Sequence, residues 1–372
     1  MLLSEPQTCV INPCSNALRQ ARAAGDTLVV GVHSDAEVKA AKGTLPVSPE
    51  AERYAAVAAC KFVDEVIQDA PYTPTKEWID KLRKTYAIDY IVHGDDPCFN
   101  PDGSDVYAYA KALDMFKIVK RTEGVSTTDI VGRMLLMTRE HHVRSPAQPT
   151  TGEPITRLRS SSWADDKQGL SVSDRSQFLP TARRIRQFAS DRVPSEADKV
   201  VYIAGAFDLF TQGHIEALKQ AKSLGTFLVV GVYDDEIVNR SRGGGHPIMN
   251  LHERCLSVLS CRYADEIIMG APRVVTEDLL RSMNVSVVTH GTVSEGKYMQ
   301  TFPESSQEPS DPLALAKQLG KFKAFESPSS LLVGDIIARV LQHRDALAAK
   351  VARKTSQERD YYDNSKKYVS ES

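Results

Sequence analysis

The chain repeats itself at a spacing of about 200 residues, and this duplication limits the folds it can adopt. Residues 14–38 (CSNALRQARAAGDTLVVGVHSDAEV) align with residues 214–238 (HIEALKQAKSLGTFLVVGVYDDEIV), and 12 of the 25 aligned pairs are identical. The match continues between residues 52–71 and 253–272 and reaches His93-Gly94 and His290-Gly291. Such a period is far too long for a solenoid repeat. The sequence therefore predicts two copies of one domain, packed as a pseudo-dimer.

Each copy has the pattern of a parallel α/β domain. In the second copy an apolar run over 200–203 leads into the small-residue turn 204–206. A helical spacing then begins at His214 and closes at Gly225, before a strand over 227–232. A glycine-lined turn between strand and helix lets backbone N–H groups face an anion, and His214 can donate to a phosphate oxygen. We predict a Rossmann-like, doubly wound parallel sheet with an anion site at the strand ends.

The repeat also sets the domain boundaries. We place an N-terminal domain at 1–143, a linker rich in Ser, Pro, Thr, Arg and Gln at 144–198, a C-terminal domain at 199–341 and a charged tail at 342–372. Within the linker, residues 176–189 mix apolar and basic side chains and are expected to form a short helix across the domain junction. A chain of 372 residues is long enough for two separate cores.

Composition narrows the class of protein. The formal net charge of −2 gives no basic field for nucleic acid, and no apolar run reaches membrane-spanning length. The N-terminus lacks a signal-peptide pattern. The six cysteines form no C-x-x-C pairs, which indicates a reduced compartment. Cys60 and Cys261 stand at matching places in apolar helical runs and are predicted core residues. These features are typical of a soluble cytoplasmic enzyme.

Two motifs resemble one enzyme family. AGAFDLFTQGH (204–214) resembles the G-x-F-D-x-x-H-x-G-H signature of the cytidylyltransferases, and RTEGVSTTDIVGRML (121–135) resembles the second motif of those that act on phosphoethanolamine or phosphocholine. The duplication favours the ethanolamine-phosphate cytidylyltransferases, and the resemblance covers nearly the whole chain after its first dozen residues. It implies two tandem nucleotidyltransferase domains. It also implies the transfer of a cytidylyl group from CTP to phosphoethanolamine, giving CDP-ethanolamine and pyrophosphate in phosphatidylethanolamine biosynthesis.

The resemblance also implies roles for individual residues. Its candidates for catalysis are Lys42, His93, Arg121 and His214. Tyr72 is the candidate for binding the substrate headgroup. The candidates for binding the nucleotide are Arg53, Asp95, Thr122, Ser126, Thr127, Thr128, Ala206, Phe207, Thr211, Gly213, Arg242, His290, Gly291 and Ser329. No resident metal site is expected, because Mg²⁺ arrives with CTP and needs few protein ligands.

Several of these residues have a simpler interpretation. Lys42 can be an exposed loop lysine, and Arg53 can belong to a structural ion pair. The hydroxyls of 126–128 can serve only as a helix cap. His93 with Asp95 and Asp96 can be a metal site, although no second histidine lies near in sequence.

Each copy departs from the family pattern. In the first copy, the segment LLSEPQTCVINPCS stands before the helix, and its Leu2-Leu3 is not expected to form a strand. Pro6 and Pro13 break this segment. Cys14 stands where the second copy has His214. The intact features that follow favour a late start of the chain over a first copy that is non-catalytic in the living protein.

In the second copy, Thr211 replaces the first signature histidine, and FESPSSLLVGD (325–335) keeps only part of the second motif. We expect impaired turnover. A site composed of both copies is disfavoured, because each sheet has its own ligand-binding edge.

Two other functions remain open at this point. One is a catalytically inactive nucleotide-binding or regulatory homologue. The other is a nucleotidyltransferase acting on glycerol phosphate or pantetheine phosphate, against which the duplication counts. A homodimer and a peripheral contact with the endoplasmic reticulum surface are also left open.

Overall fold

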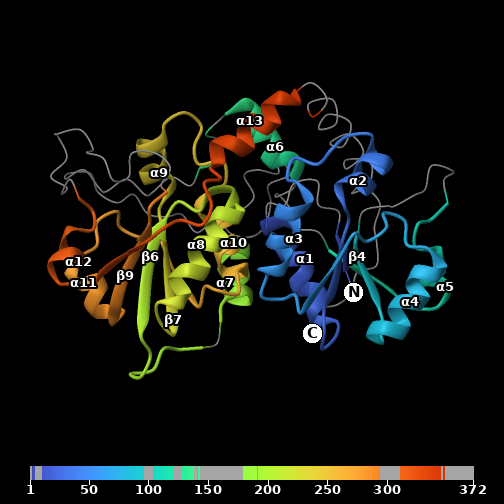
Figure 1. The fold of residues 1–372 in the computed structure, drawn as a ribbon, viewed down its shortest axis with the longest axis horizontal. Helices are drawn as coiled ribbons and strands as arrows, with labels where there is room; N and C mark the ends of the chain where they lie inside the picture. The colour runs from blue at the N-terminus through green and yellow to red at the C-terminus, as the bar shows by residue number, and fades with distance from the viewer. Residues whose placement is uncertain are drawn as a thin grey trace, which may run out of the picture.

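The computed structural model contains two five-stranded parallel sheets that lie side by side, with helices of both copies between them (Figure 1). It describes residues 2–4, 11–95, 104–120, 127–137, 139, 141–142, 179–190, 192–293, 311–344 and 347. Parallel strands need crossover connections, and a helix supplies most of the crossovers in each copy. The predicted α/β class is confirmed.

The first copy forms a sheet of strand order β3-β2-β1-β4-β5. The strands are β1 (Leu2–Ser4), β2 (Val29–Val32), β3 (Glu65–Gln68), β4 (Ile91–Gly94) and β5 (Phe116–Val119). The helices are α1 (Ile11–Ala23), α2 (Asp35–Lys42), α3 (Glu50–Ala58), α4 (Lys76–Tyr86), α5 (Ala108–Ala112) and α6 (Thr127–Leu136). The inner strand β2 is buried along its whole length, as expected for its VVGV sequence.

The second copy repeats this order as β10-β9-β6-β7-β8. The strands are β6 (Val200–Gly205), β7 (Phe227–Val232), β8 (Glu266–Met269), β9 (Val285–Gly291) and β10 (Phe322–Phe325). The helices are η2 (Asp208–Phe210, a 3₁₀ turn), α8 (Gln212–Ser223), α9 (Asp235–Arg242), α10 (Leu251–Ser260), α11 (Glu277–Ser282), α12 (Ala314–Gln318) and α13 (Val333–Gln342). The strand order reverses next to β6, where open sheets bind ligands.

The prediction that Leu2 and Leu3 form no strand is wrong. Leu2–Ser4 is β1, which pairs in parallel with β2 and with β4 in the middle of the first sheet. Its register against β2 (Leu3 with Gly31) repeats that of β6 against β7 (Ala204 with Gly231). Backbone groups alone make these bonds, and the two neighbouring strands offer edges on both sides, so three residues suffice to close the gap.

The structure places three candidate residues at or near the ends of their elements. Lys42 is the last residue of α2 rather than a loop residue, and Gly43 caps that helix in the left-handed conformation (φ 72°). Strand β4 begins at Ile91 and includes His93, so this histidine lies within the strand. The helix of the second motif begins at Thr127.

The two copies contact each other through equivalent residues. Cys60 and Cys261 face each other in an antiparallel bridge, and both are buried. The N–H of Lys61 donates to the Ser260 carbonyl at 2.8 Å, and the N–H of Arg262 donates to the Ala59 carbonyl at 2.9 Å. Such reciprocity is the property of an isologous contact. The predicted core placement of both cysteines is confirmed.

One linker helix bridges the junction. Helix α7 (Leu179–Phe188) buries Phe188 against Leu256 and Leu259 of the second copy and contacts Phe62 of the first. The Phe188 carbonyl also accepts a hydrogen bond from the Lys61 ammonium. The predicted helix across the junction is therefore present. No helix in the described part of the chain is both long enough and apolar enough to cross a lipid bilayer.

Candidate active site

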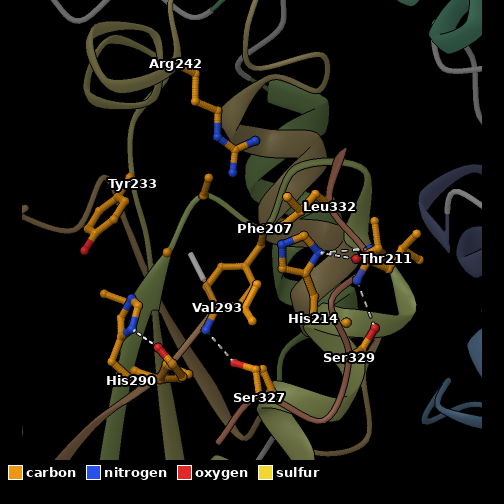
Figure 2. A pocket seen from close by; sticks show the side chains of 18 of the residues that line it. Phe207, Thr211, His214, Tyr233, Arg242, His290, Val293, Ser327, Ser329 and Leu332 are labelled. Carbon is orange, nitrogen blue, oxygen red and sulfur yellow. Dashed lines mark hydrogen bonds between the residues drawn. The ribbon is translucent and has the colours of Figure 1, made fainter. Parts of the chain in front are cut away.

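A pocket opens at the carboxyl edge of the second sheet, where β6 and β9 end (Figure 2). Its walls come from the turn after β6, the first turns of α8, the end of β9 and the segment before α13. The sequence candidates that line it are Ala206, Phe207, Thr211, Gly213, His214, Arg242, His290, Gly291 and Ser329. The structure thus brings both decayed motifs of the second copy to one site.

His214 is held in a defined tautomer at the start of α8. Its Nδ1 accepts a hydrogen bond from the backbone N–H of Thr211 at 3.0 Å, so the neutral ring carries its proton on Nε2. Burial lowers the pKa of His214 to about 4, and the positive charge of Arg242 adds to this. In Figure 2 the second ring nitrogen points away from Thr211. His214 is therefore a neutral donor near pH 7.

The turn before α8 is strained and is held by a buried carboxylate. Phe207, Leu209 and Phe210 all have positive φ (52°, 56° and 40°), which costs about 1–3 kcal/mol for each such residue. Asp208 accepts hydrogen bonds from the N–H groups of Ile248 (2.8 Å) and Met249 (2.9 Å), forty residues away. These bonds fix the backbone on which the pocket is built.

The charge of Asp208 is maintained despite complete burial. Burial alone would raise the pKa of this carboxyl. His246, Arg242 and the two backbone N–H groups outweigh burial and lower the pKa to about 2. Arg242 Nη1 lies 3.9 Å from Asp208 Oδ2. Sequence reasoning did not select Asp208 as a site residue, although it is the aspartate of the signature itself.

The remaining walls supply hydroxyls and a second histidine. His290 Nδ1 donates to the Gly291 carbonyl at 2.6 Å, and burial lowers the pKa of His290. Ser329 accepts from the N–H of Leu331 at 3.2 Å, and Figure 2 shows it beside Thr211. A Cβ at Gly213 would lie only 3.1 Å from the Leu331 carbonyl. This glycine therefore lets the second-motif segment approach the N-terminus of α8.

The first copy places His93 and Asp95 at the equivalent edge of its own sheet. His93 is buried at the end of β4, with its ring 5.0 Å from that of Tyr107, and Asp95 follows it. Tyr72 is half-buried, and its ring lies 5.1 Å from the ring of His33. Thr127 and Thr128 begin α6. Arg121, Thr122 and Ser126 lie outside the described residues, as does Asp96.

The ion-pair interpretation of Arg53 fits its surroundings. The guanidinium is fully buried and donates to Asp35 (2.6 Å), to the His33 carbonyl (2.7 Å) and to the Ser48 carbonyl (3.1 Å). A side chain engaged in this way ties α3 to the loop after β2. These bonds favour the structural interpretation of Arg53, and its contact with the triphosphate stays a prediction.

The metal alternative finds no cluster to support it in the described part of the first copy. No group of three or more His, Cys, Asp or Glu side chains among the described residues could hold an ion. Because Asp96 lies outside the described residues, the alternative of a metal site at His93, Asp95 and Asp96 is not tested, and no catalytic step is assigned to a metal.

A model of cytidylyltransferase-like domains matches the chain twice, over residues 15–133 and 202–318. These segments cover most of each sheet and leave out β1 and β10. The chain belongs to the cytidylyltransferase family. It is a duplicated nucleotidyltransferase, as the resemblance implied.

The relatives of this cytidylyltransferase are similar along nearly their whole length. The ethanolamine-phosphate cytidylyltransferase of Arabidopsis thaliana is 47% identical over 95% of this chain and 83% of the plant protein. The Dictyostelium discoideum protein of the same name is 44% identical over 94% of this chain and 93% of its own length. The Mus musculus protein is 40% identical over 92% and 86%. The predicted family is confirmed.

Proposed function

We propose that this nucleotidyltransferase transfers the cytidylyl group of CTP to phosphoethanolamine, releasing pyrophosphate. The observation that carries the proposal is the near-full-length similarity to three proteins named for that reaction. The site geometry agrees with it. A neutral histidine donor and a buried arginine stand where a polyphosphate would meet the N-terminus of α8. The nucleotide would enter as its magnesium complex.

The chemistry needs positioning and charge stabilisation rather than a covalent intermediate. A substrate phosphate oxygen attacks the α-phosphorus in line, the new P–O bond forms, and the bond to pyrophosphate breaks. Negative charge grows on the bridging and non-bridging oxygens. A donor such as the Nε2–H of His214 stabilises these oxygens, and the cationic Arg242 neutralises charge across the pocket. The carbon skeleton of phosphoethanolamine takes no part in the reaction.

We further propose that the chain as printed turns over slowly. Cys14 stands where a donor histidine would stand in the first copy, and Thr211 replaces one in the second. The Thr211 hydroxyl lies 3.2 Å from His214 Nδ1 and so holds that ring in place. Loss of one preorganised donor typically costs about 10²–10³ in rate.

The test is formation of labelled CDP-ethanolamine from labelled CTP by the protein purified free of host enzyme. We expect a rate at least roughly 100-fold below that of a variant whose residues 2–14 are replaced by a strand and a complete G-x-F-D-x-x-H-x-G-H signature. Equal turnover by the two proteins would contradict slow turnover. No product from either protein would contradict the proposed reaction. Glycerol phosphate and pantetheine phosphate, tested as competing acceptors, separate the alternative substrates.

A second candidate function is nucleotide binding without turnover by the second copy. Two features of the second copy favour this candidate. The Thr211 N–H donates to His214 Nδ1, and the second motif is only partly kept. CTP bound by wild type but not by an H214A/R242A variant, with no product formed, is the expected result for this candidate. The reciprocal contacts support the pseudo-dimer. A homodimer of the whole chain, a contact with the endoplasmic reticulum surface and a cytoplasmic location stay predictions.

A further inference from the structure

Helix α6 carries the start of the first copy's second motif, yet it packs mainly against the second copy. Its buried side chains Ile130, Val131 and Met134 belong to an apolar cluster in which Val47 is the other buried first-copy member. The remaining buried members come from the second copy: Leu209, Ile248, Met249, Val333, Ile336 and Val340. Figure 1 shows α6 beside α13, between the two sheets. The position of α6 therefore depends on the second copy.

A two-pronged ion pair orients this helix. Arg133 Nη1 lies 2.7 Å from Glu253 Oε2, and Arg133 Nη2 lies 2.9 Å from Glu253 Oε1. The side chains are only 16% and 6% exposed. A fork-to-fork contact fixes the direction of the guanidinium as well as its distance, so it opposes both sliding and rotation of α6. Glu253 itself is fixed, because it accepts from the N–H of Asn250 at 2.8 Å.

The residues after α6 are also held by the second copy. Arg139 Nε donates to the Gly244 carbonyl at 2.8 Å. His141 and His142 each place Nε2 within 3.0 Å of the Pro247 carbonyl. The C-terminal end of α6 is thus tied to the loop between α9 and α10.

The duplication supplies an equivalent ion pair in the other copy for comparison. Arg339 on α13 occupies the place of Arg133, and Glu52 on α3 occupies that of Glu253. Arg339 reaches Glu52 with one nitrogen, Nη1, at 2.9 Å, and its side chain is 32% exposed. The more buried, bidentate pair belongs to the helix whose motif is retained, and the looser pair belongs to the helix whose motif has decayed.

From this asymmetry we infer that Arg133 and Glu253 are positioning residues for the nucleotide site of the first copy. The second copy acts through this pair to set the position of α6, which begins at Thr127 and Thr128. The inference rests on the proposed function and on the nucleotide-binding roles that the family resemblance implies for Thr127 and Thr128. Neither Arg133 nor Glu253 is required to touch the nucleotide.

The experiment compares R133M and R133K with R339M, which changes the equivalent arginine of the second copy, in the full-length chain. Hydrogen exchange of the peptide covering 127–136 is followed while CTP with magnesium is added, in a background that carries H214A/R242A so that the second-copy pocket does not contribute to the signal. We expect CTP to slow exchange in the wild-type peptide. R133M should raise the CTP concentration at half-effect roughly tenfold, since small misplacements of a site are costly. R133K should lie between R133M and wild type, and R339M should stay within about twofold of wild type.

Thermal melting of the variants provides the folding control. Similar melting temperatures for R133M and R339M, with only R133M weakening the CTP response, support positioning. Equal CTP shifts in both variants, or none in R133M, overturn it. A wild-type peptide whose hydrogen exchange is unchanged by CTP also overturns it. If CTP protects α6 but no CDP-ethanolamine ever forms, the inference stands and the proposed reaction fails.

Discussion

The two copies share a strand order and a buried arginine, yet each keeps a different part of the family's site. The first retains the acidic residue after its histidine strand and the segment leading into α6. The second retains the signature turn, His214 and a formed pocket. Their interface residues are nevertheless equivalent, and the tighter ion pair holds the helix of the better motif. Decay of a binding motif therefore does not entail decay of the surface that supports its neighbour.

The buried arginines of the two copies provide the strongest test of how the copies differ in stability. Arg254 is fully buried, pairs with the equally buried Asp235 at 2.7 Å, and donates to the carbonyls of Ala206 and Tyr233 at 2.6 Å each. Removing it in R254M leaves a carboxylate and several carbonyls unsatisfied. We expect the free energy of unfolding to fall by about 4 kcal/mol.

The matched variant in the first copy is R53M. Asp35, the partner of Arg53, is 30% exposed and can be solvated when the arginine is lost, so we expect a smaller loss of about 2 kcal/mol. Urea unfolding of both variants measures the difference. A loss from R53M as large as that from R254M would show that burial of the partner does not decide the cost.

A pH titration of stability sharpens the comparison, because the first copy has Cys14 where the second has His214. The pKa of His214 is lowered to about 4 in the folded protein, against 6.5 for an unperturbed histidine. At pH values between these two pKa values, His214 binds a proton in the unfolded chain but not in the folded chain. Stability is therefore lost as the pH falls from 6.5 toward 4, by about 2 kcal/mol.

H214Q isolates this contribution. The variant lacks the titrating ring, so its free energy of unfolding should fall less than that of wild type between pH 7 and pH 4.5. Chemical denaturation at both pH values gives the two differences. Identical pH dependence in wild type and H214Q would show that His214 is not held neutral in the fold.

The smallest expected effect concerns the central strand of the second sheet. The Tyr202 hydroxyl on β6 is buried and has no hydrogen-bond partner among the described residues, and burial raises the pKa of this phenol. It packs over Gly231, where a Cβ would come within 2.3 Å of the hydroxyl oxygen. We expect Y202F to stabilise the protein by about 1 kcal/mol, because a desolvated polar group is removed.

Thermal unfolding of Y202F beside wild type measures this gain. A destabilised Y202F would mean that the hydroxyl fills space or finds a partner worth more than its desolvation. The first copy has only the three-residue β1 at this place in its sheet. The result would therefore also bear on how much the longer β6 adds to the second copy.

Sequence reasoning predicted the duplicated α/β fold, the anion-facing turn and the place of His214, because these depend on patterns within a few turns of chain. Period-2 and period-3.6 spacing, a glycine turn and a helix start are local properties, and the repeat doubled each signal. It failed at β1, where three residues lack a pattern long enough to read. There the neighbouring strands, and not local preference, hold the segment.

Only the tertiary structure decided the roles of Asp208, Arg53 and the Arg133–Glu253 pair. Asp208 bonds to backbone groups forty residues away, and Arg133 pairs with a residue 120 positions along the chain. A charged residue can face solvent, a ligand or a partner side chain. The free energy of each of these states depends on burial and geometry, and both are set only when the chain folds. Packing within each copy and between the two copies therefore determines which charges hold the fold.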